Sequence, residues 1–153
     1  EIPLRLVGSE MCIRDRFTNF DIRDERIDIN ESDTCLIISI TRDIKDNVNE
    51  YILETGLKIG RMITLTIGGR GPSFDSIQNA NHAINLVQQV ISSLAQRTTT
   101  ERKASVHVFA SAPNAFMFFL GQRSRGFGNC VLYEFDLEAK DTGTYSPSFK
   151  NLP

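Results

Sequence analysis

The sequence predicts an open, Rossmann-like α/β sheet that is mostly parallel, carries helices on both faces and ends in a C-terminal hairpin at its edge. Two observations support this fold class. Short apolar runs of strand length alternate with segments whose apolar residues recur every three or four positions, as they do on one face of a helix. The connections between successive strands are of helix length, which makes neighbouring strands parallel through right-handed crossovers.

Four predicted strands form the body of the sheet. The first is dense in β-branched residues and nearly continuous in apolar character, which is typical of a strand buried on both faces. The others have strand length and strand composition. The strands are expected at Cys35–Ile40, Met62–Ile67, Val106–Ala110 and Val131–Asp136.

Three predicted helices connect these strands. Apolar residues at helical spacing place the first at about residues 48–53, with Gly56 as its C-cap. The second covers residues 77–94 and begins at Asp75 or Ser76 as N-cap. The third runs from residue 115 to Gly121.

The remaining segments are polar. Residues 17–34 are expected to form a linker or an edge segment, with a short strand near Arg26–Ile29. Gln96–Lys103 is expected to be a polar connection, and a turn at Asp141–Gly143 leads into the terminal hairpin. Residues 35–153 are therefore expected to form one domain.

The first sixteen residues have neither helical nor strand periodicity. Val7–Arg16, VGSEMCIRDR, closely resembles the peptide produced when a sequencing-library adapter is translated in frame with a gene fragment. Residues 1–16 are therefore interpreted as a non-native leader and excluded from the fold prediction. The alternative is a natural, flexible N-terminal segment.

Composition excludes several classes of function. The chain has 153 residues and a net charge of −2, so it offers no basic field for direct DNA binding. Three cysteines without paired spacing and only two histidines argue against a disulfide framework, and the sequence predicts no metal site and no cofactor. No apolar run reaches the length of a membrane span, which favours a cytoplasmic protein.

The three predicted strand-to-helix turns are expected at one edge of the sheet, where ligands bind in open α/β folds. Free backbone N–H groups and the positive end of each helix dipole suit an anionic ligand such as a phosphate. Glycines allow close backbone approach, and two arginines would add charge-assisted contacts. The predicted ligand-binding residues are Thr41, Arg42, Asp43, Gly68, Gly69, Arg70, Ser111, Ala112, Pro113 and Asn114.

Each of these signals has a simpler structural interpretation. The Gly-Gly-Arg-Gly turn matches neither the dinucleotide fingerprint nor the P-loop, and it also fits a tight turn. Pro113 also fits the first turn of a helix. His107 is expected to be a core or edge histidine, and His82 to lie on a solvated helix face. Ser111 lacks a GxSxG elbow, so no catalytic set emerges and binding is favoured over chemistry.

The order of motifs from about Cys35 to Leu152 resembles a SAVED domain, a sensor module of bacterial anti-phage systems that is related to CARF domains. The most specific stretch is His107–Gly121, HVFASAPNAFMFFLG, in which an apolar strand and a small residue precede a proline, small residues and Leu-Gly. The strand Val131–Phe135 and the closing Gly143–Pro147 are similar to the end of the family's domain.

The resemblance implies a sensor that binds a cyclic oligonucleotide and activates a fused effector. It also implies that the chain holds the C-terminal half of a two-part domain, with the effector missing upstream and homo-oligomer formation possible. Two alternatives remain open at this point. One is a ring nuclease or small α/β hydrolase that uses Ser111, Arg42 or Arg70 on a phosphodiester, and the other is a structural half-domain that supports oligomer contacts.

Overall fold

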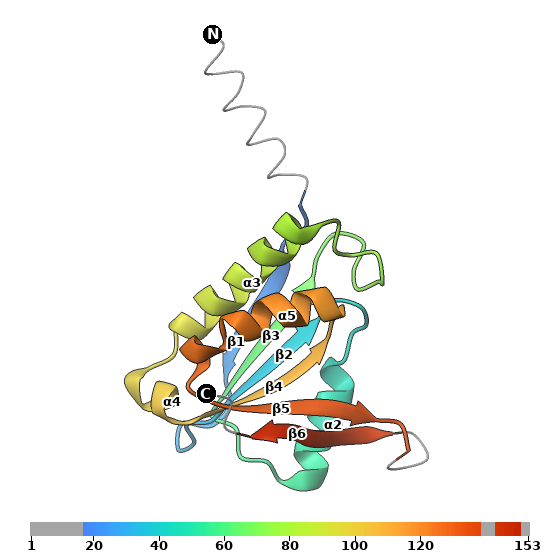
Figure 1. The fold of residues 1–153 in the computed structure, drawn as a ribbon. Coiled ribbons are helices and arrows are strands. Elements are labelled where there is room, and N and C mark those ends of the chain that lie inside the picture. The colour runs from blue at the N-terminus through green and yellow to red at the C-terminus, as the bar shows by residue number, and fades with distance from the viewer. Residues whose placement is uncertain (1–16, 139–142, 151–153) are drawn as a thin grey trace, which may run out of the picture.

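The computed structural model describes residues 17–138 and 143–150, which form one six-stranded sheet flanked by helices (Figure 1). The predicted leader, residues 1–16, and residues 141–142 of the predicted hairpin turn lie outside the described part of the chain. The strands and helices are β1 (Phe20–Arg26), β2 (Thr34–Ser39), α2 (Lys45–Thr55), β3 (Arg61–Ile67), α3 (Ala80–Ala95), α4 (Thr99–Lys103), β4 (Ser105–Ser111), α5 (Asn114–Gln122), the 3₁₀ turn η1 (Ser124–Phe127), β5 (Asn129–Asp136) and β6 (Thr144–Lys150).

The strand order confirms the predicted fold class. The sheet runs β1-β3-β2-β4-β5-β6. The four central strands are parallel, whereas β1 pairs antiparallel with β3, and β6 pairs antiparallel with β5 as the predicted hairpin. The parallel pairs are joined by helical crossovers, because a tight turn cannot connect parallel strands.

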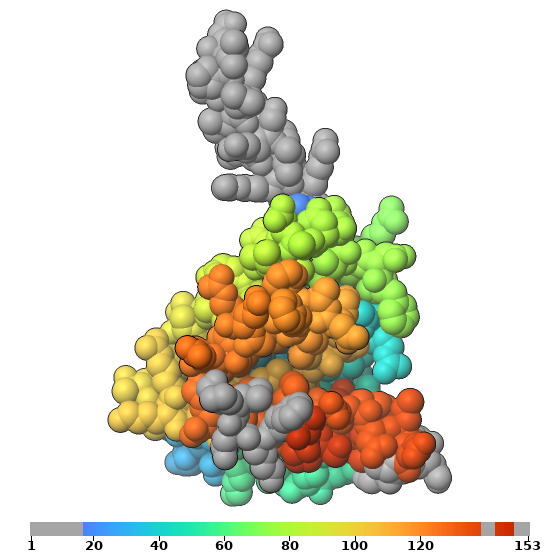
Figure 2. All heavy atoms as spheres, viewed as in Figure 1, coloured from blue at the N-terminus to red at the C-terminus, as the bar shows by residue number. Residues whose placement is uncertain are grey.

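Helices cover both faces of the sheet. On the face that Figures 1 and 2 present, α3 and α5 lie side by side and bury Leu36, Ile38 and Val108 of the central strands. On the opposite face, α2 packs with the β5–β6 hairpin over Ile37 and Phe109. The central strands are therefore buried on both sides, which explains their nearly continuous apolar character.

Two polar segments differ from the prediction. The edge strand is Phe20–Arg26 rather than Arg26–Ile29. Phe20 is its only buried residue, so the strand is held mainly by backbone pairing along β3. The segment expected as a polar connection contains α4, which begins with a capping box between Thr98 and Glu101.

Helix α3 begins later than predicted. Its N-cap is Asn79 rather than Asp75 or Ser76, and the Asn79 side chain accepts a hydrogen bond from the N–H of His82. The C-cap prediction for α2 is confirmed, because Gly56 follows the helix in the left-handed conformation that glycine favours, with φ of 66°.

A buried ionic cluster ties α4 to the edge of the sheet. The carboxylate of Glu101, 1% exposed, accepts hydrogen bonds from Arg26, from Arg61 at 2.9 Å and from the Thr98 N–H at 2.7 Å. Arg61 also holds both carboxylate oxygens of Asp24 at 2.7 Å. Burial raises the pKa of Glu101, but the bonds from Thr98 and Arg61 outweigh it and hold that pKa below its ordinary value.

Two cysteines in the described residues are free and buried, as expected for small apolar side chains. Burial raises the pKa of the Cys35 thiol to about 12 and that of Cys130 to about 11. Neither thiol is therefore ionised near neutral pH. Across residues 17–138 and 143–150, no helix combines the length and apolar character that a membrane span requires.

Candidate functional site

Backbone hydrogen bonds join the three predicted turns into one continuous surface. The N–H groups of Ile40 and Thr41 both donate to the carbonyl of Ser111 at 2.9 Å, which links the turn after β2 to the turn after β4. The N–H of Ser73 donates to the carbonyl of Ile40 at 3.0 Å, which draws in the loop after β3. The hydroxyls of Thr41 and Ser111 lie 2.6 Å apart and share a hydrogen bond.

This surface lies where the chain changes direction across the sheet. From the neighbouring strands β2 and β4, the chain proceeds to α2 on one face and to α5 on the other. Adjacent strands whose connections diverge in this way leave a crevice at their carboxyl ends, and ligands of open α/β folds bind there. The hydroxyl pair of Thr41 and Ser111 lies at this switch point.

The loop after β3 encloses a polar hollow of about 410 Å³ beside that switch point. Gly69 and Gly71 have positive φ, 66° and 84°, so the turn they form is one that side chains with a Cβ rarely adopt. The hollow's volume is within the range of small-molecule sites, about 300–1,000 Å³. It is lined by Thr18, Ile67, Gly68, Gly69, Arg70, Gly71, Ser73, Asp75, Ser76 and Gln78.

Three of the ten predicted site residues, Gly68, Gly69 and Arg70, line the hollow. Thr41 and Ser111 lie in the turns that are hydrogen-bonded to its loop. The other five belong to the same two turns but lie outside the lining of the hollow: Arg42, Asp43, Ala112, Pro113 and Asn114.

Only part of the predicted helix-dipole contribution is present. Helix α5 begins at Asn114, directly after Pro113, as the prediction requires. The glycine turn, in contrast, is not followed directly by a helix, because α3 begins at Ala80. An anion in the hollow would therefore be held by Arg70 and by loop backbone rather than by the end of α3.

His82 supports the floor of the hollow, and its predicted position on a solvated face is wrong. It is fully buried, because the chain before β1 lies over it and Phe17 stacks on its ring at 5.0 Å. Its Nδ1 accepts the N–H of Gln78 at 3.1 Å, so its Nε2 carries the proton and donates to the carbonyl of Thr18 at 2.7 Å. Both partners line the hollow.

Replacing His82 by alanine is expected to lower the free energy of unfolding by about 1–3 kcal/mol, because it leaves two backbone groups without partners. Amide exchange at Gln78 should accelerate more than exchange within β4. Urea denaturation and hydrogen exchange measure the two effects. The matched control is Asn81→Ala at an exposed neighbouring position, which should stay within about 0.5 kcal/mol. Equal urea midpoints for both variants would contradict the supporting role of His82.

His107 is a satisfied core histidine, as predicted. Its Nε2 lies 3.0 Å from the carboxylate of Asp33, and its Nδ1 lies 2.9 Å from the hydroxyl of Tyr133. Burial raises the pKa of Tyr133 to about 12, so this phenol stays protonated near neutral pH. Both histidines are thus engaged away from Ser111, whose hydroxyl bonds Thr41 instead of a base.

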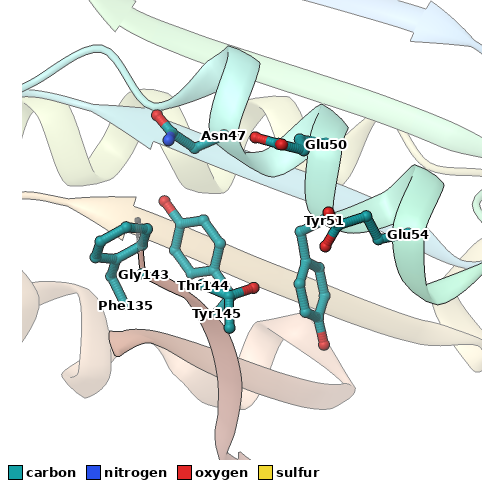
Figure 3. A pocket seen from close by; sticks show the side chains of 8 residues that line it. All are labelled: Asn47, Glu50, Tyr51, Glu54, Phe135, Gly143, Thr144 and Tyr145. Carbon is teal, nitrogen blue, oxygen red and sulfur yellow. The ribbon is translucent and has the colours of Figure 1, made fainter. Parts of the chain in front are cut away.

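A second hollow lies between α2 and the β5–β6 hairpin (Figure 3). Its volume of about 30 Å³ is enough for one or two water molecules, which occupy about 10–15 Å³ each by this measure, and too little for an organic ligand. The hollow is lined by Asn47, Glu50, Tyr51, Glu54, Phe135, Gly143, Thr144 and Tyr145.

Within the described ranges, no set of three histidine, cysteine or carboxylate side chains is arranged to hold a metal ion.

Sequence reasoning missed most of the loop beyond the glycines. Ser73, Asp75, Ser76 and Gln78 line the hollow. Asp75 or Ser76 was predicted as the N-cap of the second helix, and Gln78 as part of that helix. A signal was present, because a proline, two serines and an aspartate directly after Gly-Gly-Arg-Gly indicate loop rather than helix. Thr18 had no local signal, since it reaches the hollow only through the pairing of β1 with β3.

Comparison with solved structures agrees with the fold described above. The Acinetobacter baumannii Cap4 SAVED/CARF-domain containing receptor, solved with the cyclic trinucleotide 3′3′3′-cAAA, has a TM-score of 0.61 and 22% identity, covering 87% of this chain and 28% of that one. The structure of this receptor with 2′3′3′-cAAA has a TM-score of 0.62 and 26% identity, covering 87% of this chain and 27% of that one. These likenesses establish the shared fold.

Comparison of sequences identifies the family. CD-NTase-associated protein 4 of Enterobacter hormaechei subsp. hoffmannii (strain UCI 50) is 40% identical over 119 residues, which are 78% of this chain and 23% of that protein. The chain thus spans about a quarter of the length of these relatives. The model of the SMODS-associated and fused to various effectors sensor domain matches residues 12–150. The chain therefore belongs to the SAVED family of sensor domains.

Proposed function

We propose that this chain binds a cyclic oligonucleotide second messenger and that binding activates an effector in bacterial antiviral defence. The observation that carries the proposal is the polar hollow after β3, which adjoins the hydrogen-bonded turns after β2 and β4. Membership of a sensor-domain family supports it. The A. baumannii receptor, which has a similar fold and was solved with cyclic trinucleotides, also supports it.

The chemistry of this surface suits a nucleotide ring. Arg70 in the hollow and Arg42 on the neighbouring turn supply guanidinium groups for phosphates. Ser73 and Gln78 supply polar groups for sugars and bases. The ten predicted residues are proposed as the binding set, and the hollow adds Thr18, Ser73, Asp75, Ser76 and Gln78 to it.

Isothermal titration of the chain tests this proposal. The panel holds 3′3′3′-cAAA, 2′3′3′-cAAA, cyclic dinucleotides and cyclic tetranucleotides, with linear ApApA as the control. Binding heat is expected for at least one cyclic ring and none for the linear trinucleotide. Arg70→Ala should weaken binding of that ring about tenfold or more, since hydrogen bonds to charged groups contribute about 1.5–3 kcal/mol. A panel without any binding heat would reject the proposal.

Chromatography of the ligand after each titration separates sensing from hydrolysis. An intact ring is expected, because Ser111 has no base beside it and bonds the hydroxyl of Thr41. Linear products would instead support a ring nuclease. The test is direct, because a sensor and a nuclease predict opposite fates for the same molecule.

A further inference from the structure

An exposed aromatic ring lies within the loop that lines the hollow. Phe74 is 83% exposed, although a phenylalanine side chain gains free energy when it is removed from water. Its sequence neighbours Ser73 and Asp75 both line the hollow, whereas Phe74 itself lies outside the lining, beside that site. Among the described residues, no other aromatic ring packs against Phe74.

The backbone that carries Phe74 is fixed on both sides. The hydroxyl of Ser76 accepts the N–H of Ser73 at 2.9 Å and donates to the carbonyl of Gly71 at 3.3 Å. The Ser73 N–H also reaches the carbonyl of Ile40 at 3.0 Å, which anchors the loop to the end of β2. The ring is therefore presented by a closed turn, and little backbone freedom remains to be lost when it contacts a ligand.

The hollow is lined by side chains of both charges. Asp75 lines it together with Arg70, so a carboxylate and a guanidinium group share the site. A carboxylate repels phosphate but accepts hydrogen bonds from the amino groups of nucleobases. The exposed ring of Phe74, next to two lining residues in the sequence, offers a flat apolar surface on which a base can stack.

We infer that Phe74 is a base-stacking residue and that the loop Pro72–Gln78 receives one nucleobase of the ligand. This inference rests on the proposed function and deepens it, because it assigns a base rather than a phosphate to this part of the site. The phosphates then lie toward Arg70 and the turns after β2 and β4. Stacking is tolerant of base identity, so Phe74 contributes affinity and the polar groups below it contribute selectivity.

Titration of Phe74 variants with the cyclic trinucleotide that binds the unchanged chain tests this assignment. Phe74→Ala is expected to raise the dissociation constant by about 5- to 150-fold, the range measured for loss of one stacked base. Phe74→Tyr should bind within about threefold of the unchanged chain, because it keeps the ring. The matched control is Phe118→Ala on α5, which removes another exposed ring at 63% exposure and should leave the dissociation constant unchanged.

A second readout reports the contact itself. A cyclic trinucleotide carrying 2-aminopurine in place of adenine should lose fluorescence on binding to the unchanged chain and to Phe74→Tyr, and should retain it with Phe74→Ala. If Phe74→Ala matches the unchanged chain in both affinity and quenching, the inference is overturned while the proposed function stands. If no ring binds the unchanged chain, the proposed function itself fails. A change in sedimentation alone would assign Phe74 to a contact between copies and also overturn the inference.

Discussion

Replacing Phe109 by alanine is expected to lower the free energy of unfolding by about 3–5 kcal/mol. Phe109 is fully buried in the central strand β4, where its ring stacks on Tyr133 at 4.2 Å. The rings of Tyr145 and Tyr51 meet its edge at 5.0 and 5.8 Å. Alanine would leave a cavity among three aromatic side chains from three different elements, and their rigid rings fill it poorly.

Urea denaturation at pH 7 measures this effect. Phe118→Ala is the matched control, because it makes the same chemical change at a side chain that is 63% exposed. The control should stay within about 0.5 kcal/mol of the unchanged chain. Comparable losses in the two variants would show that the aromatic cluster under α2 contributes little to stability.

Replacing Glu101 by glutamine is expected to lower the free energy of unfolding by about 3 kcal/mol, the cost of removing one partner of a buried ion pair. The glutamine keeps the shape of the side chain but leaves Arg26 and Arg61 without their shared carboxylate. The control is Lys58→Ala, which breaks an exposed pair with Glu31 at 3.6 Å and should cost less than about 1 kcal/mol.

The difference in unfolding free energy between the unchanged chain and Glu101→Gln is expected to depend on pH. The pKa of Glu101 is held below its ordinary value of 4.5, so the carboxylate stabilises the fold fully above that pH. Its contribution is lost as the pH falls through the lower, folded-state pKa. The stability difference between the unchanged chain and Glu101→Gln should thus be constant from pH 7 to 5 and shrink at lower pH. A difference that grows on acidification would contradict this assignment.

The fold was predictable because its central strands are buried on both faces. Continuous runs of apolar, β-branched residues such as Cys35–Ile40 predict a strand whatever surrounds them. The edge strand β1 lacked such a signal, since its residues after Phe20 are exposed and its stability comes from pairing with β3. Helix α4 was predictable in principle, because Thr98 and Glu101 have the spacing of a capping box.

The candidate site was predictable to the level of its turns. Parallel strands bring their carboxyl ends to one edge, so the grouping of Thr41 and Ser111 follows from strand order alone. Which side chains enclose the hollow depends on the path of the loop after Gly71, and no local pattern specifies that path. His82 shows the same limit, because its burial results from the chain before β1 lying over α3.

The order of strand pairing also has a consequence for how the chain folds. Of the strand pairs in the described ranges, β5–β6 alone joins strands that follow one another without a helix between them. Thr34 at the start of β2 pairs with Val106 of β4, and β1 finds its partner in β3, after a whole strand and helix have intervened. Contacts this distant require long loops to close first, so we expect folding in milliseconds to seconds rather than microseconds. During synthesis β1 emerges before β3 and stays unpaired until β3 is available. Its charged side chains Asp21, Arg23 and Glu25 disfavour aggregation through that unpaired strand.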